Sequence, residues 1–200
     1  MAASSSSVSL PTPARTRFEG DPGRVAVVVP GVGYSPAHPL LDYARLVLLQ
    51  HGWTVQQLWW RIPGEFRGFT AAERSEWVEA QVAAAVDAEG GACRMLVGKS
   101  LGSLATGFAA DRNLPAAWLT PLLTSPRVAD ALVRTKAPTL LVGGTGDSLW
   151  DARVADELPH RVLEIPSADH ALLIPGDAVR SAGVLQRVTA ELDTFVGAVG

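Results

Sequence analysis

The serine at position 100 lies in a sequence pattern that is typical of a reactive nucleophile. Residues 98–102 read GKSLG, which has the form G-x-S-x-G, and they directly follow the apolar run 95–97. In a turn from a buried strand into a helix, such glycines permit a tight bend that exposes the serine hydroxyl. The N–H groups that open the helix face the same point, where negative charge would develop during acyl transfer. The pattern predicts a nucleophilic Ser100, although a tight turn packed for steric reasons has the same sequence.

An acid and a histidine follow two later apolar runs, in the order that a serine nucleophile requires. Asp147 ends the glycine-rich segment 143–147 (GGTGD), and His170 ends the segment 166–170 (PSADH). A serine hydroxyl is a poor nucleophile until an adjacent base takes its proton. His170 would accept that proton from Ser100, and Asp147 would orient the imidazole and stabilise its charged form. The three residues therefore predict a catalytic triad.

Two other carboxylates compete with Asp147 for the role of the orienting acid. Asp151 comes four residues later, and Asp169 directly precedes His170. We expect Asp151 to lie within or cap a short helix. We expect Asp169 to point away from the histidine ring, because neighbouring side chains diverge. Asp147 is the prediction, and Asp151 is the rival.

The segment after the first predicted strand would complete the site with an oxyanion hole. Residues 30–34 read PGVGY. Glycines let the backbone approach a substrate closely and leave an N–H free to point into the cleft. We expect the N–H groups of Val32 and Leu101 to be the donors. A plain loop that needs positive φ angles would have the same composition.

Apolar runs alternate with segments of helical periodicity, which predicts an α/β protein. The fold class is a doubly wound, mainly parallel six-stranded sheet with helices on both faces. In such a sheet the carboxyl ends of the strands share one edge, where ligands bind. The predicted strands are residues 24–29, 53–60, 94–98, 116–120, 138–143 and 161–165, and the predicted helices are residues 39–51, 71–88, 100–110, 127–134, 150–157 and 177–196.

The composition predicts one globular domain, residues 18–200, behind a flexible tail, residues 1–17. Hydrophobic residues make up 48% of the 200-residue chain, which is enough to bury a substantial core. A net charge of −3 argues against nucleic acid as a partner. No stretch reaches the roughly 18 apolar residues of a membrane helix, and the start of the chain lacks the apolar region of a secretory signal. With a single cysteine, the sequence predicts a cytoplasmic protein that is a monomer or a homodimer.

Two cofactor motifs are only partly present, so we predict no cofactor and no metal. The segment 98–100 (GKS) ends like a phosphate-binding loop, but that motif needs a glycine at position 93, which is cysteine. The segment 31–33 (GVG) begins like a dinucleotide fingerprint, but position 36 is proline. The remaining histidines show no spacing typical of metal ligands; they are His38, His51 and His160.

The triad segments resemble the α/β-hydrolase family over about residues 24–197. The resemblance rests on residues 98–102, the turn ending at Asp147 and the histidine segment 168–170. It implies a serine hydrolase that works through a covalent acyl-enzyme without a cofactor. Where the family often has His-Gly after its first conserved strand, this chain has Pro-Gly, and the antiparallel strands before residue 24 look reduced or absent. Only residues 121–126 occupy the place of the cap insertion, so the chain resembles small, lidless esterases and dienelactone-hydrolase-like proteins.

The substrate is predicted from apolar side chains near the ends of the strands. We expect Tyr34, Trp60, Leu122 and Trp150 to contact a small, fairly apolar ester, with core packing as the alternative for the tryptophans. Lys99, beside the predicted nucleophile, is expected to be solvated. The same acyl-transfer chemistry would serve a carboxylic ester, a thioester or a lactone. The alternative function is a noncatalytic binding protein that retains the fold.

Overall fold

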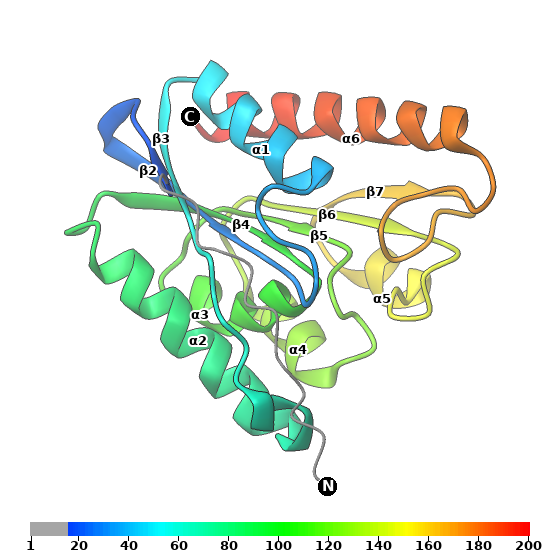
Figure 1. Ribbon diagram of the computed structural model, residues 1–200, viewed down its shortest axis with the longest axis horizontal. Coiled ribbons are helices and arrows are strands. Elements are labelled where there is room, and N and C mark those ends of the chain that lie inside the picture. The colour runs from blue at the N-terminus through cyan, green and yellow to red at the C-terminus, as the bar shows by residue number, and fades with distance from the viewer. Residues whose placement is uncertain (1–15) are drawn as a thin grey trace, which may run out of the picture.

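The computed structural model describes residues 16–200 and shows one seven-stranded sheet with helices on both sides (Figure 1). The strand order is β1-β3-β2-β4-β5-β6-β7. All neighbouring strands are parallel except β1, which runs antiparallel to β3. The strands are β1 (Arg17–Phe18), β2 (Asp21–Val29), β3 (Trp53–Gln57), β4 (Cys93–Lys99), β5 (Ala116–Leu119), β6 (Thr139–Gly144) and β7 (Arg161–Ile165).

The central strands are buried on both faces because two layers of helices cover the sheet. In β2, Ala26 and Val28 pack into the core on one face, whereas Val27 and Val29 pack into the core on the other. Helices α1 (Pro39–Gln50) and α6 (Ala178–Val199) lie side by side over the first face (Figure 1). The second face carries the remaining helices, which are α2 (Ala71–Asp87), α3 (Thr106–Asp111), α4 (Pro126–Arg134), α5 (Ala152–Glu157) and the 3-10 helices η1 (Gly64–Gly68) and η2 (Ser100–Ala105).

The structure confirms the predicted α/β architecture and adds one strand to it. All six predicted strands are present, and the short β1 makes a seventh, which pairs with β3 through Arg17 and Phe18. The second predicted strand ends at Gln57 instead of Trp60. The predicted helix 100–110 begins as the 3-10 helix η2 and continues as α3.

The predicted tail, residues 1–17, lies outside the described residues except at its end. There Arg17 belongs to β1, so the prediction that the flexible tail extends to residue 17 is wrong for this residue. Within residues 16–200, no helix is long and apolar enough to cross a membrane.

Candidate active site

Ser100 lies at the bend between β4 and η2, in a backbone conformation that few residues adopt. Its φ angle is +50°, in the left-handed region. The flanking glycines are required by close packing, since a Cβ on Gly98 would lie 2.4 Å from the Trp118 ring. A Cβ on Gly102 would lie 2.9 Å from the carbonyl oxygen of Val29. The bend therefore has the geometry that its sequence pattern predicts, with the serine at the tip.

Ser100, His170 and Asp147 form a continuous chain of hydrogen bonds. His170 Nε2 lies 2.7 Å from Ser100 Oγ, and His170 Nδ1 lies 2.6 Å from Asp147 Oδ2. Because a carboxylate accepts hydrogen bonds only, Nδ1 carries the proton and Nε2 is free to accept one from the serine. The Asp147 side chain is 1% exposed and the His170 side chain 35%, so the imidazole faces solvent while its acid does not. This arrangement can activate a serine hydroxyl.

Asp147 is held by its own turn, which follows β6. Its Oδ1 accepts the N–H of Leu149 at 2.9 Å, and its backbone N–H donates to the carbonyl of Gly144. Gly146 donates its N–H to the carbonyl of Ala168, two residues before the histidine. The acid turn and the histidine loop are therefore joined by backbone as well as by side chains.

The two rival carboxylates are engaged in other interactions. Asp151 caps α5, where its Oδ1 accepts the N–H groups of Arg153 and Val154. Asp169 Oδ1 accepts the N–H groups of Ala171 and Leu173 in the histidine loop. Of the three carboxylates, Asp147 is the one that bonds the imidazole.

Both predicted oxyanion donors belong to segments beside the serine. A Cβ on Gly31 would lie 3.3 Å from Ser100 Cβ, which places the loop after β2 directly against the bend. Val32 follows Gly31 and is exposed. Leu101 lies in the first turn of η2, where N–H groups have no partner within the helix. These positions remain predictions for the donors.

Lys99 is buried, so the expectation that it is solvated is wrong. Lys99 is 2% exposed, and its Nζ donates to Thr120 Oγ1 at 3.0 Å and to the carbonyl of His170 at 2.9 Å. Lys99 follows Met95 and Val97 at a spacing of two, so it points into the face of the sheet that α1 and α6 cover. Burial lowers the pKa of Lys99 to about 8, against an opposing effect of nearby carboxylates. Side chains alternate between the two faces of a strand, and this alternation is the sequence signal that could have predicted the burial of Lys99.

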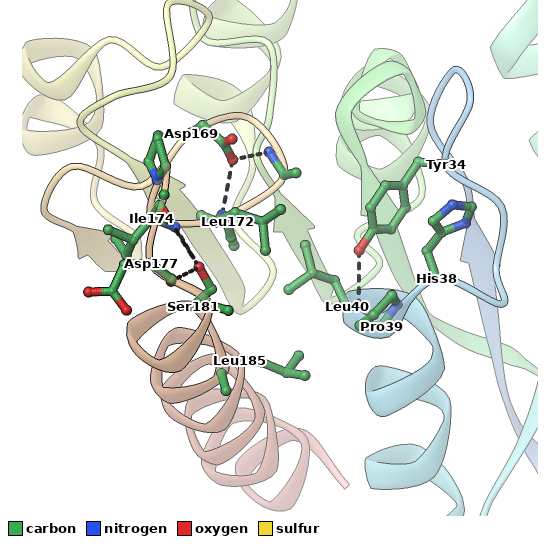
Figure 2. A pocket seen from close by; sticks show the side chains of 16 residues that line it. Tyr34, His38, Pro39, Leu40, Asp169, Leu172, Ile174, Asp177, Ser181 and Leu185 are labelled. Carbon is green, nitrogen blue, oxygen red and sulfur yellow. Dashed lines mark hydrogen bonds between the residues drawn. The ribbon is translucent and has the colours of Figure 1, made fainter.

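An apolar cavity of about 810 Å³ opens between the start of α1 and the histidine loop (Figure 2). Tyr34, a predicted substrate contact, forms one wall, and its hydroxyl accepts the N–H of Leu40. Burial raises the pKa of Tyr34. The opposite wall is the apolar run 171–175, which follows His170 directly, and the start of α6. The sequence analysis did not single out this run, although five consecutive apolar residues beside the histidine were visible.

The other predicted contacts lie in different surroundings. Trp60 lines a smaller pocket of about 170 Å³ beside Gly31 and Tyr34, and its ring packs against Trp77. Leu122 is half-buried and packs against the core on the second face of the sheet, and its backbone N–H donates to Ser103 Oγ, so its contact with substrate stays a prediction. Trp150 is buried in the core under β6, where its indole N–H donates to Glu164. The structure thus places Trp150 in the core, which was the alternative for the tryptophans.

In residues 16–200, no group of three or more His, Cys, Asp and Glu side chains could hold a metal ion. The single cysteine, Cys93, is buried, and burial raises its pKa to about 11, so it is not a reactive thiolate.

Comparisons with known proteins agree with this geometry at the level of the fold. No protein-family model matches the sequence, and no curated protein matches it either. Among solved structures, Est1E from Butyrivibrio proteoclasticus with bound ferulic acid is similar, with a TM-score of 0.67 and 14% identity over 91% of this chain and 93% of that chain. A monoacylglycerol lipase from Paleococcus ferrophilus has a TM-score of 0.65 and 17% identity over 90% and 97% of the two chains.

A third similar structure is described as having no lid. XC6422 from Xanthomonas campestris, described as an α/β serine hydrolase without lid, has a TM-score of 0.59 and 18% identity over 94% of this chain and 86% of that chain. In the present structure, residues 120–125 alone connect β5 to α4, so no cap is inserted there. From its sheet order, its serine bend and these similarities, the chain has the α/β-hydrolase fold in a lidless form.

Proposed function

We propose that this protein is a serine hydrolase that cleaves carboxylic esters through an acyl-enzyme. The observation that carries the proposal is the unbroken hydrogen-bond chain from Ser100 through His170 to Asp147. Each of its two links is shorter than 2.8 Å, within the range in which a base can take a proton from a nucleophile. A noncatalytic protein with this fold has no need to retain all three groups in bonding positions.

The reaction would run in two halves on these residues. Ser100 Oγ attacks the ester carbonyl carbon, His170 Nε2 takes the hydroxyl proton, and the carbonyl π electrons move to the oxygen. When the carbonyl re-forms, the bond to the alcohol breaks and the alcohol leaves with the proton from His170. Water then attacks the acyl group, again giving its proton to His170. The acid departs and the proton returns to Ser100, so the enzyme is restored.

The tetrahedral intermediates would need donors for their negative oxygen. The loop after β2 and the first turn of η2 flank Ser100, and the N–H groups of Val32 and Leu101 are our candidates. One such donor typically contributes about a hundred- to a thousandfold in rate. Residue 30 is proline and has no backbone N–H, so a donor from this loop must come from a later residue.

The cavity supports an apolar substrate. Two of its polar side chains already bind the protein's own backbone: Asp169 accepts N–H groups of its loop, and Ser181 Oγ accepts the N–H of Ile174 (Figure 2). A ligand there would meet mainly aliphatic carbon, and the volume lies in the range of small-molecule sites, about 300–1,000 Å³. We therefore propose that an acyl or alkyl chain of the ester lies between Tyr34 and Leu185. Thioesters and lactones would fit the same machinery.

Labelling with a fluorophosphonate tests the triad directly. Wild-type protein is expected to be labelled and Ser100→Ala not, while Ser125→Ala, which removes a serine that caps no helix N–H, is labelled normally. For an ester that wild-type protein hydrolyses, kcat of Ser100→Ala should be about a millionfold lower. No labelling of wild type together with no hydrolysis would overturn the enzyme proposal and favour the noncatalytic alternative.

A series of esters of increasing chain length tests the cavity. Ala182→Trp places a large ring in the cavity wall, so kcat/KM should fall for long-chain esters and stay the same for an acetate ester. Ala190→Trp is the matched control, because Ala190 lies two turns further along α6 and outside this cavity. If Ala182→Trp lowers kcat/KM equally for short and long esters, the acyl or alkyl chain of the substrate binds outside this cavity.

A further inference from the structure

Lys99 directly precedes the proposed nucleophile, and its ammonium group lies buried beneath the histidine loop. Nζ donates to the carbonyl oxygen of His170 at 2.9 Å and to Thr120 Oγ1 at 3.0 Å. Lys99 ends β4, Thr120 follows β5 and His170 follows β7. The ammonium therefore links three segments that leave the sheet at the same edge.

A fourth segment contributes an aromatic ring to the same ammonium. Nζ lies 4.7 Å from the centroid of the Tyr34 ring, a distance at which a cation is attracted to the π face. Tyr34 is fixed in turn, because its hydroxyl accepts the N–H of Leu40 at the start of α1. The loop after β2, which contains the proposed oxyanion donor, is thus held by the same cation.

The segments that Lys99 joins are strained. Thr120 has a φ angle of +46° and is fully buried, and the histidine loop has φ angles of +63° at Ser167 and +56° at Leu172. Non-glycine residues in this region are energetically unfavourable and persist only where their surroundings hold them. The bond from Lys99 to the His170 carbonyl lies between the two strained positions of the loop. This hydrogen bond can therefore stabilise the unfavourable backbone conformation of the loop.

The buried charge also has a cost that an apolar side chain of similar length would avoid. Among the described residues, no carboxylate lies within ion-pair distance of Nζ, and the carboxylates of Asp147 and Asp169 act on it only from farther away. Replacing a buried ion by an apolar group is often neutral or stabilising. The favourable contribution of the ammonium must come from the groups that it binds, and one of these is the backbone of the proposed base.

We propose that Lys99 is a positioning residue of the triad: its ammonium holds the His170 carbonyl, and with it the imidazole, in register with Ser100. This inference rests on the proposed function, because it concerns the same serine and histidine. Ser100 is the next residue along the chain from Lys99, so this side chain connects the strand end that carries the nucleophile to the backbone of the base. The ammonium itself is shielded from substrate by its burial.

Lys99→Met tests the proposal, because it keeps an unbranched apolar stem and removes both hydrogen bonds. Misplacing a catalytic group by about 1 Å can cost on the order of a hundredfold, so we expect kcat to fall by that order while KM changes little. Thr120→Val removes one of the two bonds and should show a smaller loss. Thr139→Val is the matched control: it removes a buried hydroxyl bonded to Ala137 at the opposite end of β6, and kcat should stay at the wild-type value.

A second measurement does not depend on activity. The proton between His170 Nδ1 and Asp147 gives a downfield NMR signal when it is protected from solvent, and its exchange rate reports how firmly the loop is held. We expect exchange to quicken in Lys99→Met and to a lesser degree in Thr120→Val, but not in Thr139→Val. If Lys99→Met does not fold, as judged by circular dichroism, the Thr120→Val variant carries the test.

The outcomes separate the two proposals. If wild type is labelled at Ser100 and Lys99→Met keeps both kcat and the slow proton exchange, the positioning role is wrong and the hydrolase proposal stands. If wild type is neither labelled nor active, the hydrolase proposal is wrong. The proton exchange then still decides whether Lys99 holds the histidine: faster exchange in Lys99→Met supports this role, and an unchanged rate overturns it.

Discussion

The Ser100 bend and the His170 loop reach the same point of the molecule by different means. The bend is set by packing close to it, with Gly98 against the Trp118 ring and Gly102 against β2. The loop is set by hydrogen bonds to residues far away in the sequence, including Asp147 and Lys99. The nucleophile is therefore positioned by sterics and the base by polar side chains. Substitutions at the two places should fail in different ways.

Among substitutions that leave Ser100 in place, Asp147→Asn should give the largest loss of activity, with little effect on the fold. The amide can present an N–H to the histidine ring and so favour the wrong tautomer, and a change of this kind in a serine protease triad costs about ten-thousandfold in kcat. We expect a loss of the same order here, measured as kcat for a hydrolysed ester.

Asp151→Asn is the control for the acid. Asp151 caps α5 through Oδ1, a role that asparagine also fills, so both stability and activity should change little. A severe loss in Asp151→Asn together with a mild one in Asp147→Asn would transfer the role of the acid to Asp151.

Gly98→Ala changes the Ser100 bend, and it should lower both the free energy of unfolding and kcat. The new Cβ would lie 2.4 Å from a Trp118 ring that is itself buried, so neither group can move away freely. Overpacking of this kind costs about 3 kcal/mol of unfolding free energy at the upper end of its usual range. Chemical denaturation measures the loss, and kcat should fall with it because Ser100 shifts.

Gly183→Ala provides the control for Gly98→Ala. Gly183 lies inside α6 with no atom near its would-be Cβ, so alanine there should stabilise the protein by about 0.5–1 kcal/mol. If Gly98→Ala leaves the unfolding free energy as high as wild type, the bend is not set by its packing on Trp118.

The same difference explains how far the sequence predicts the site. The bend is encoded in five consecutive residues, so its pattern was readable without knowledge of the rest of the fold. The positions of Asp147 and His170 followed from the order of the strands, because parallel strands bring their carboxyl ends together. The strand β1 could not be predicted, since two residues carry no periodicity and Phe18 is ordered by pairing with Val55.

Lys99 was misjudged because it was considered as a single charged residue. Its place two residues after Val97 assigns it to the buried face of β4, but charge argues for solvent, and only the partners decide between the two. Those partners lie in the segments that follow β5, β7 and β2, and no local pattern brings them together. Trp150 is the converse case: its place beyond a strand end suggested a pocket, whereas close packing on Gly143 holds it in the core.

Lys99 joins the two regions, and its ionisation should have an effect on stability that is smaller than that of Gly98→Ala and depends on pH. Burial lowers its pKa in the folded protein to about 8, from 10.5 for an ordinary lysine, although Asp147 and Asp169 oppose this shift. Between these two values the unfolded chain binds more protons than the folded one, so stability rises with pH. The cost of the buried ammonium is present in full below about pH 8 and is relieved as pH approaches 10.5.

Wild type and Lys99→Met should therefore diverge with pH. The unfolding free energy of wild type minus that of Lys99→Met should increase by about 2 kcal/mol between roughly pH 7.5 and 9.5. The other groups around Nζ are Tyr34, Asp147, Asp169 and His170, and both proteins contain them, so the subtraction removes most of their contribution. Urea denaturation at several pH values measures the difference. A difference that stays constant over this range would mean that the folded and unfolded chains bind the same number of protons, so that burial does not lower the pKa of Lys99 and the link between the bend and the loop keeps its full charge.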